Sequence, residues 1–202
     1  MFDLRVRKNG RPLLVGHRGA LEVAPENTMP AFAAGLAGGA DILELDVQLT
    51  ADNQLIIFHD ITLEAKFKLP GMIGDYAAEF LRSLDVGSQF DGRFANTHMP
   101  FLSEVLAWAK GRIALMIELK HGPVFDPALD EGVVGLVEDY GMSGEVVLIS
   151  SDQFALQRVK RLNSRIATSF IFSGRLLNPQ RLVEGLDVDA LSPRTDLLTR
   201  EE

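Results

Sequence analysis

Six short apolar segments recur along the chain, and stretches with a helical pattern separate them. Strands that are covered by helices read as nearly continuous apolar runs, so this rhythm predicts an α/β fold built on a parallel sheet. The expected strands are Leu13–Gly16, Ile42–Val47, Ile113–Leu119, Val146–Ser150, Ile166–Phe172 and Val188–Leu191. The expected helices are Thr28–Leu36, Leu102–Lys110, Pro127–Tyr140, Asp152–Leu162 and Pro179–Leu186.

Capping residues mark several ends of these helices. Thr28 is expected to be an N-cap, because its hydroxyl can accept a hydrogen bond from a free amide of the first turn. Gly38, Gly111 and Gly141 are expected to take the left-handed conformation that follows many helices. The helix boundaries are therefore predicted from turn chemistry as well as from the apolar pattern.

One pair of apolar segments is too close together for a crossover helix. Seven residues follow Val47 before a second apolar run, Leu55–Phe58. Parallel strands need a connection of about a dozen residues or more, whereas antiparallel strands can be joined by a tight turn. We therefore expect a hairpin centred near positions 51 and 52, which would lay His59 beside Glu44.

The pattern weakens between Thr62 and Met99, where four glycines interrupt it and one short helix is expected around Tyr76–Leu84. This stretch, about residues 61–99, is interpreted as a small cap inserted over one end of the sheet. The 202 residues, of which 47% are hydrophobic, are sufficient for one domain with a sizeable core.

Polar residues lie in or directly after the apolar segments. Because ligands of parallel α/β folds bind at the carboxyl ends of the strands, these side chains should converge on one cavity. The converging residues are His17, Arg18, Glu44, Asp46, His59, Asp60, Glu118 and Lys120.

Three of these residues are candidate metal ligands. Glu44, Asp46 and Glu118 supply carboxylate oxygens, which suit one hard divalent cation, Mg²⁺ or Ca²⁺. The alternation of Glu44 and Asp46 could also mark a solvated face. The apolar residues on both sides of them make an unpaired charge costly there, and this favours a metal site.

The remaining polar residues fit the breakage of a phosphodiester. His17 and His59 are candidate catalytic residues, since an imidazole titrates near neutrality and can accept or donate a proton. Arg18 and Lys120 could bind the phosphate or could be surface charges. Glu26 is a supporting residue that stabilises a helix dipole or anchors its loop. His98 and His121 are interpreted as structural hydrogen-bonding residues.

Charge and hydropathy limit the partners. The formal net charge of −8 disfavours nucleic acid as a ligand, so a small molecule is expected. No apolar run approaches the roughly 18 residues of a membrane span, and the N-terminus lacks the apolar core of a signal peptide, which together predict a cytoplasmic protein without an integral membrane segment. The sequence contains no cysteine and leaves the oligomeric state open.

Five motifs in order resemble the signatures of the glycerophosphodiester phosphodiesterase family. They are Val15-Gly16-His17-Arg18-Gly19-Ala20, Ala24-Pro25-Glu26-Asn27-Thr28, Glu44-Leu45-Asp46-Val47, Phe58-His59-Asp60 and Ile117-Glu118-Leu119-Lys120. The resemblance covers residues 13 to 199. One departure follows the second histidine, where the family usually has a segment containing threonine and arginine and this chain has Ile61-Thr62-Leu63-Glu64-Ala65-Lys66-Phe67.

The resemblance implies a TIM-type (β/α)₈ barrel with a small inserted cap, as a single domain over residues 1–202, and release of sn-glycerol 3-phosphate and an alcohol. It places the catalytic pair on His17 and His59, the metal ligands on Glu44, Asp46 and Glu118, and the phosphate contacts on Arg18 and Lys120. In the family, the glycerol hydroxyl of the substrate is thought to attack first, giving a cyclic phosphate that water opens. Only six of the eight strands are expected, so the barrel is truncated after the sixth.

Two other functions compete with this one. A phospholipase D of the spider-toxin type would share the barrel, both histidines and the acidic site, but such proteins are secreted and disulfide-bonded, unlike a chain without cysteine. The second alternative is a catalytically inactive barrel that acts as a binding domain.

Overall fold

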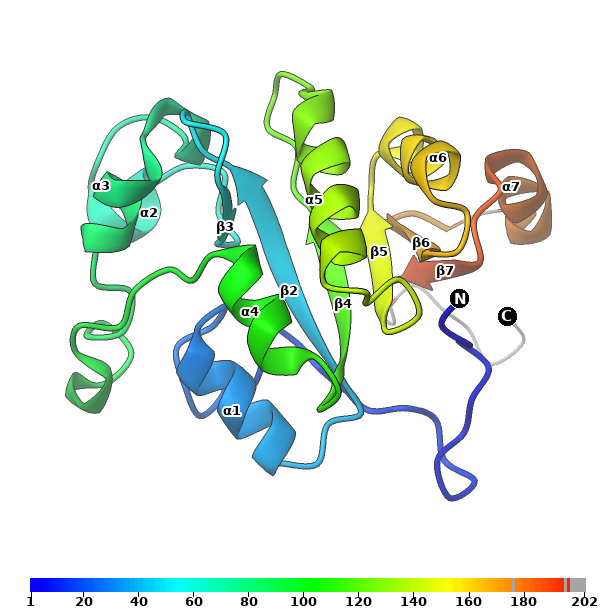
Figure 1. Ribbon diagram of the computed structural model, residues 1–202, viewed down its shortest axis with the longest axis horizontal. Coiled ribbons are helices and arrows are strands. Elements are labelled where there is room, and N and C mark those ends of the chain that lie inside the picture. Colours follow the sequence, from blue (N-terminus) through cyan, green and yellow to red (C-terminus); the bar gives the residue numbers. More distant parts are fainter. Residues whose placement is uncertain (176, 195, 197–202) are drawn as a thin grey trace.

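The protein is built on a curled sheet of parallel strands, seen in a computed structural model that describes residues 1–175, 177–194 and 196 (Figure 1). The strands pair in the order β1-β2-β4-β5-β6-β7. They are β1 (Val15–Gly16), β2 (Ile42–Leu49), β4 (Ala114–Leu119), β5 (Val146–Ser150), β6 (Ala167–Phe172) and β7 (Ala190–Pro193). All five of these pairings are parallel, so the six predicted strands and their direction are confirmed.

Helices cover the outer face of this sheet, and all five predicted helices are confirmed to within two residues at each end. They are α1 (Met29–Ala37), α4 (Leu102–Ala109), α5 (Pro127–Asp139), α6 (Gln153–Leu162) and α7 (Pro179–Leu186). The main core lies between them and the sheet, where Leu45, Val47, Leu115 and Ile117 are completely buried. In the described part of the chain, no helix combines the length and the apolar character that crossing a membrane requires.

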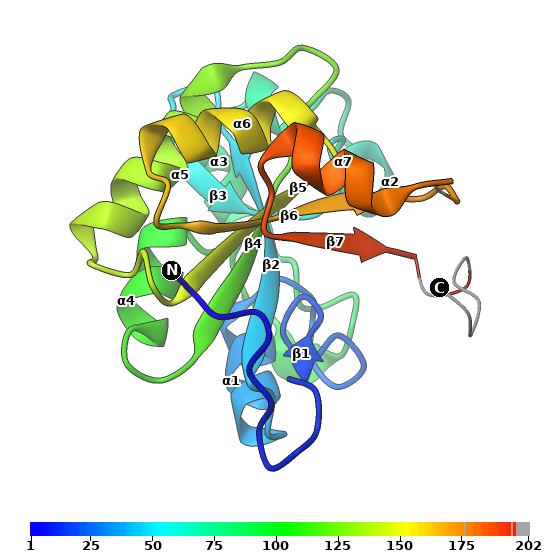
Figure 2. The same ribbon diagram turned by 90° about the vertical axis from the view of Figure 1, so that its right-hand side faces the viewer.

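The curvature of the sheet is that of a TIM-type barrel, as predicted. In Figure 2 the strands fan out, α5, α6 and α7 lie on one side, and the N-terminal segment passes on the other. Phe2 and Leu4 of that segment pack on the concave face against Val147, Ile149 and Ala167. Among the described residues, β1 and β7 are the first and the last strand of this parallel series. The end of the resemblance, at Thr199, lies outside the described residues.

A hairpin follows β2, as predicted. β3 (Leu55–Ile57) is antiparallel to β2 and pairs Ile57 with Val47 and Leu55 with Leu49. This register centres the hairpin on position 52 and would place position 59 opposite 45, one residue away from the predicted neighbour Glu44. The cause is a loop one residue longer than a two-residue turn: Thr50 donates its amide to the Gln54 carbonyl at 3.0 Å, and Asn53 is left-handed, with φ of 58°.

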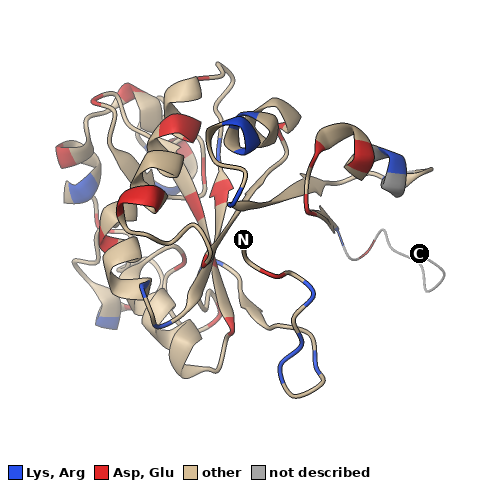
Figure 3. Cartoon of the chain, turned by 45° about the vertical axis from the view of Figure 1, so that its right-hand side comes forward, with Lys and Arg blue, Asp and Glu red and all other residues tan. Residues whose placement is uncertain are grey.

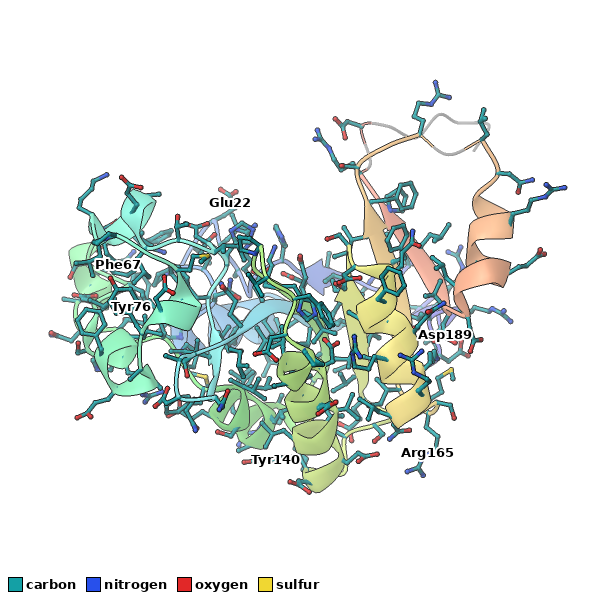
Figure 4. All side chains as sticks on the ribbon, turned by 90° about the horizontal axis from the view of Figure 1, so that it is seen from above. Glu22, Phe67, Tyr76, Tyr140, Arg165 and Asp189 are labelled. Atoms are coloured by element: carbon teal, nitrogen blue, oxygen red, sulfur yellow. The ribbon has the colours of Figure 1, made fainter. Side chains whose placement is uncertain are left out.

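The inserted stretch at residues 61–99 has a hydrophobic cluster of its own. It contains α2 (Glu64–Phe67), the 3₁₀ turns η1 (Ile73–Asp75) and η2 (Gly92–Phe94), and α3 (Ala78–Ser83), which confirms the short helix expected near residue 80. Ile56 and Phe58 of the hairpin are buried in this cluster, so the insertion packs on the end of β3. Figure 4 labels its partly buried Phe67 and Tyr76 at the far end of the molecule from Asp189, beside β7.

The predicted helix caps are confirmed except at one glycine. The Thr28 side chain accepts a hydrogen bond from the amide of Ala31, and Gly111 and Gly141 are left-handed, with φ of 69° and 67°. The prediction for Gly38 is wrong, because its φ is −73°. α1 continues to Ala37, one residue further than expected, and the left-handed residue is therefore Gly39, with φ of 86°.

Candidate functional site

The loop between β1 and α1 carries His17 and Arg18 and is held by unusual backbone conformations. Arg18 and Gly19 both have positive φ, of 50° and 92°. The Arg18 amide donates to Glu44 Oε2 at 2.9 Å, and the Arg18 carbonyl accepts from the Asn27 amide at 3.0 Å. The backbone of Arg18 therefore fixes the loop to β2 and to the segment just before α1, without help from the side chains of the loop.

Gly19 is essential for this geometry, which gives a testable prediction. A Cβ at Gly19 would lie 2.6 Å from the carbonyl carbon of Ala31 in α1, and the φ of 92° disfavours any side chain. Gly19→Ala is expected to lower the free energy of unfolding by about 2–4 kcal/mol in urea titrations. Gly10→Ala is the matched control, because its φ is 80° and no atom lies within 4 Å of the added Cβ. Equal losses in both variants would show that the contact with Ala31 is unimportant.

Three carboxylates meet where β2 and β4 lie side by side. Glu44 and Asp46 point to the same face of β2, and Asp46 pairs in register with Glu118 of β4. One oxygen from each of the three lies within 4.8 Å of the others. Glu44 is 5% exposed and Asp46 only 1%. Figure 3 shows acidic positions in red on the central strands, and the distances above show that the cluster predicted from the sequence is brought together.

Burial makes these negative charges costly. Desolvation, together with the neighbouring Asp46 charge, raises the pKa of Glu44 to about 8 from its ordinary 4.5. Desolvation also raises the pKa of Glu118, although Lys120 opposes the shift. A divalent cation would relieve both the burial and the mutual repulsion, and three oxygen donors are the set that a hard cation prefers. The residues present therefore fit a metal site.

Two basic side chains border the acids. Lys120 Nζ lies 3.2 Å from Asp46 Oδ1 and 2.8 Å from Glu118 Oε1. Burial alone would lower the pKa of Lys120, but the charges of Asp46 and Glu118 outweigh it and raise the pKa. Arg18 donates through Nη1 to Glu26 Oε2 at 2.9 Å, so Glu26 anchors this guanidinium.

The Arg18 side chain also has a buried donor that is not used. Its Nε lies 3.5 Å from Asp46 Oδ2, and among the side chains that the structure describes it is the one buried polar atom without a hydrogen-bond partner. An unsatisfied buried N–H is costly, so this donor is suited to an incoming oxyanion.

The two candidate catalytic histidines follow β1 and β3, which both pair with the edge of β2 that faces away from β4. His17 Nε2 is 3.8 Å from Glu44 Oε2, and its side chain is 61% exposed. Partial burial and the Arg18 charge lower the pKa of His17, which favours the neutral imidazole. His59 follows Phe58, whose amide donates to the Asp46 carbonyl at 3.0 Å, and its Nδ1 lies 2.8 Å from Asp60 Oδ1. The chain fold thus brings His59 to the level of Asp46.

Two further residues, to which the sequence pattern assigns no role, hold this site. Asn27, 2% exposed, donates through Nδ2 to Asp46 Oδ2 at 2.7 Å and accepts the Asp46 amide at 3.2 Å. Asp60 contacts His59 as described above. Both residues lie inside the motifs quoted above. A polar residue such as Asn27, placed next to a helix start, could have been predicted to make a side-chain hydrogen bond there. His121, expected to be structural, contacts the fully buried Asp130 of α5 at 2.8 Å.

The raised pKa of Glu44 predicts how stability depends on pH. The folded, metal-free protein keeps this proton up to about pH 8, whereas the unfolded chain loses it near 4.5. The melting temperature of the metal-free protein is therefore expected to fall between about pH 5 and pH 8. A divalent cation should restore the lost stability at the upper end. Thermal melts with EDTA and with Mg²⁺ or Ca²⁺ test this, and Glu44→Gln should flatten the profile. A constant melting temperature across the range contradicts the assignment.

Comparisons with known proteins agree with one another. Residues 17–201 match the sequence profile described as the Glycerophosphoryl diester phosphodiesterase family. A glycerophosphodiester phosphodiesterase of Caldanaerobacter subterraneus subsp. tengcongensis is 30% identical over 184 residues, which cover 91% of this chain and 76% of the relative. A glycerophosphodiester phosphodiesterase of Bacillus altitudinis is also 30% identical, over 89% of this chain and 74% of its own length.

A solved structure gives the same result. The Oleispira antarctica phosphodiesterase, in complex with the product sn-glycerol-3-phosphate, superposes with a TM-score of 0.87 at 26% identity. The match covers 93% of this chain and 77% of that one. The chain thus spans about three quarters of the length of the relatives described here.

Proposed function

Because the chain belongs to the glycerophosphoryl diester phosphodiesterase family, we propose that it hydrolyses glycerophosphodiesters to sn-glycerol 3-phosphate and an alcohol, with the help of one divalent cation. The observation that carries this proposal is the meeting of Glu44, Asp46 and Glu118 within 4.8 Å, next to the imidazole of His17 and two cationic side chains. The Oleispira relative, whose structure holds sn-glycerol-3-phosphate, supports this choice of product.

Glu44, Asp46 and Glu118 would hold Mg²⁺ or Ca²⁺ in this proposal. The bound cation would supply neutralisation of the phosphate charge and polarisation of the phosphorus. Arg18 and Lys120 would bind the equatorial oxygens of the phosphate, and the free Arg18 Nε is a donor available for that contact. When the substrate binds, the ammonium of Lys120 would contact a phosphate oxygen in addition to Asp46 and Glu118.

The histidines would move the protons. His17, with its lowered pKa, is suited to accept the proton from the attacking hydroxyl of the glycerol group. His59, held at Nδ1 by Asp60, would donate a proton to the oxygen of the departing alcohol. The cyclic phosphate formed in this step would then be opened by water, with the two histidines exchanging roles.

Release of glycerol 3-phosphate from glycerophosphocholine, measured with and without EDTA, separates the candidate functions. Release that stops with EDTA supports the proposal. Cleavage of a lysophospholipid or sphingomyelin in preference to glycerophosphocholine would favour a phospholipase D-like enzyme. A well-folded sample that releases nothing would favour a binding domain. The insertion at 61–99 as a cap unit, and a cytoplasmic location, stay predictions.

A further inference from the structure

Gln48 is a buried polar residue to which the proposed chemistry gives no role. It is 4% exposed and lies on β2 in the same alternating series as Glu44 and Asp46, so it faces the same side of the sheet. Its Nε2 donates to the carbonyl of Phe58 at 2.7 Å and to the carbonyl of Asp60 at 2.9 Å. One side-chain amide thus binds the two carbonyls that flank His59.

This contact lies just beyond the end of β3, where backbone pairing between β2 and β3 stops. β3 ends at Ile57, and the Phe58 amide still bonds to the Asp46 carbonyl at 3.0 Å. At Phe58 and Asp60, the side chain of Gln48 replaces the strand partner. Rotation of either flanking peptide would break one of the two bonds and would turn the His59 ring away from Asp60.

The chemistry of this position requires an amide. Two carbonyl oxygens need two donors, and the NH₂ group of glutamine supplies both without adding a charge. A glutamate would present only acceptors to the two carbonyls and would add a fourth acid beside Asp46. A methionine has a similar length and volume but no donor. The residue type at position 48 is therefore decided by the turn that carries His59.

We propose that Gln48 is a positioning residue that fixes the backbone on both sides of His59 and so aims its imidazole at the leaving oxygen. The inference rests on the proposed function, in which His59 is the proton donor. Gln48 touches neither substrate nor metal in this role, because both hydrogens of its amide are used on Phe58 and Asp60.

Gln48→Met tests the proposal in the full chain. With glycerophosphocholine and saturating Mg²⁺, kcat is expected to fall about 10- to 100-fold, while KM and the metal requirement change less than about 2-fold. The p-nitrophenyl ester of glycerol 3-phosphate provides the decisive readout, because its leaving group needs no proton. With this ester the first turnover, followed as release of p-nitrophenolate, is expected to slow by less than about 3-fold, because His59 is needed only later, as the base that activates water.

Matched variants separate positioning from a general loss of structure. Gln54→Met makes the same change on the same hairpin, where Nε2 donates only to the exposed carbonyl of Asp52, and should keep normal rates with both substrates. Gln48→His keeps one donor at a similar reach and should give an intermediate kcat. If Gln48→Met does not fold, Gln48→His and the ¹⁵N spectrum of the His59 ring decide: the wild type should show one tautomer and the variant a mixture.

Three results would contradict the proposed roles of Gln48 or His59. A normal kcat in Gln48→Met, or an equal loss with both substrates, would overturn the positioning role. An unchanged ring spectrum in Gln48→His would do the same. If His59→Ala itself keeps the wild-type rate, then the proposed function of His59 fails, and this is a different outcome from failure of Gln48 alone.

Discussion

Replacing His17 or His59 by alanine is expected to lower kcat for glycerophosphocholine by about 100-fold or more, because each imidazole carries a proton-transfer step. The side chains are 61% and 31% exposed, so their removal leaves no large cavity, and the melting temperature should stay within a few degrees of the wild type. Steady-state assays of glycerol 3-phosphate release and thermal melts measure the two effects.

The two histidines should differ in their response to the leaving group. With the p-nitrophenyl ester, His59→Ala is expected to regain much of the rate of the first turnover, followed as release of p-nitrophenolate, whereas His17→Ala is not, because the attacking hydroxyl still has to lose its proton. His98→Ala is the control, since His98 was given no catalytic role. A near-normal rate in either variant would remove that histidine from the mechanism. An equal rescue of both variants would contradict the assignment of His59 alone as the proton donor to the leaving group.

Removing the divalent cation is expected to have the second large effect, a loss of about 10³-fold in kcat, which corresponds to several kcal/mol of charge stabilisation in the transition state. EDTA followed by titration with Mg²⁺ or Ca²⁺ measures the loss and its recovery. The cation that restores the rate at the lower concentration identifies the preferred metal.

Glu44→Gln links that effect to the acidic cluster. The variant should need a higher metal concentration for half-maximal activity, since one charged ligand is lost, and should approach its own plateau at high metal. Glu104→Gln is the matched control, because Glu104 of α4 is paired with Arg82 of α3 and is not part of the cluster. An enzyme that works fully in EDTA, or equal metal requirements in both variants, would show that the cluster is not a functional metal site.

The local apolar pattern was sufficient to predict the strands, the outer helices and the hairpin. A buried parallel strand must be apolar on both faces, so its position can be predicted from a single apolar run such as Val146–Ile149. The acids at 44, 46 and 118 could be placed together for the same reason, because a charge inside such a run needs a partner. Glycines at 111 and 141 were predictable from the backbone conformation that only they adopt easily.

Other features depended on contacts between distant segments. The hairpin register is shifted by one residue because the turn is one residue longer than expected, with Asn53 in the left-handed conformation. The pairing of β2 with β3 decides this turn length. Asn27 bonds Asp46 across nineteen positions, and Phe2 and Leu4 cover the concave face of the sheet. None of these contacts leaves a periodic signal in the sequence.

The amino-acid sequence by itself determined which residues are buried, which strands they form and which groups can carry charge at the strand ends, because burial and periodicity are properties of short segments. Only the tertiary structure decided how those groups are held: the Arg18 amide on Glu44, the Asn27 amide on Asp46 and the Gln48 amide on either side of His59. Such hydrogen bonds need distances of about 3 Å and defined angles, which are set when loops from different parts of the chain pack together.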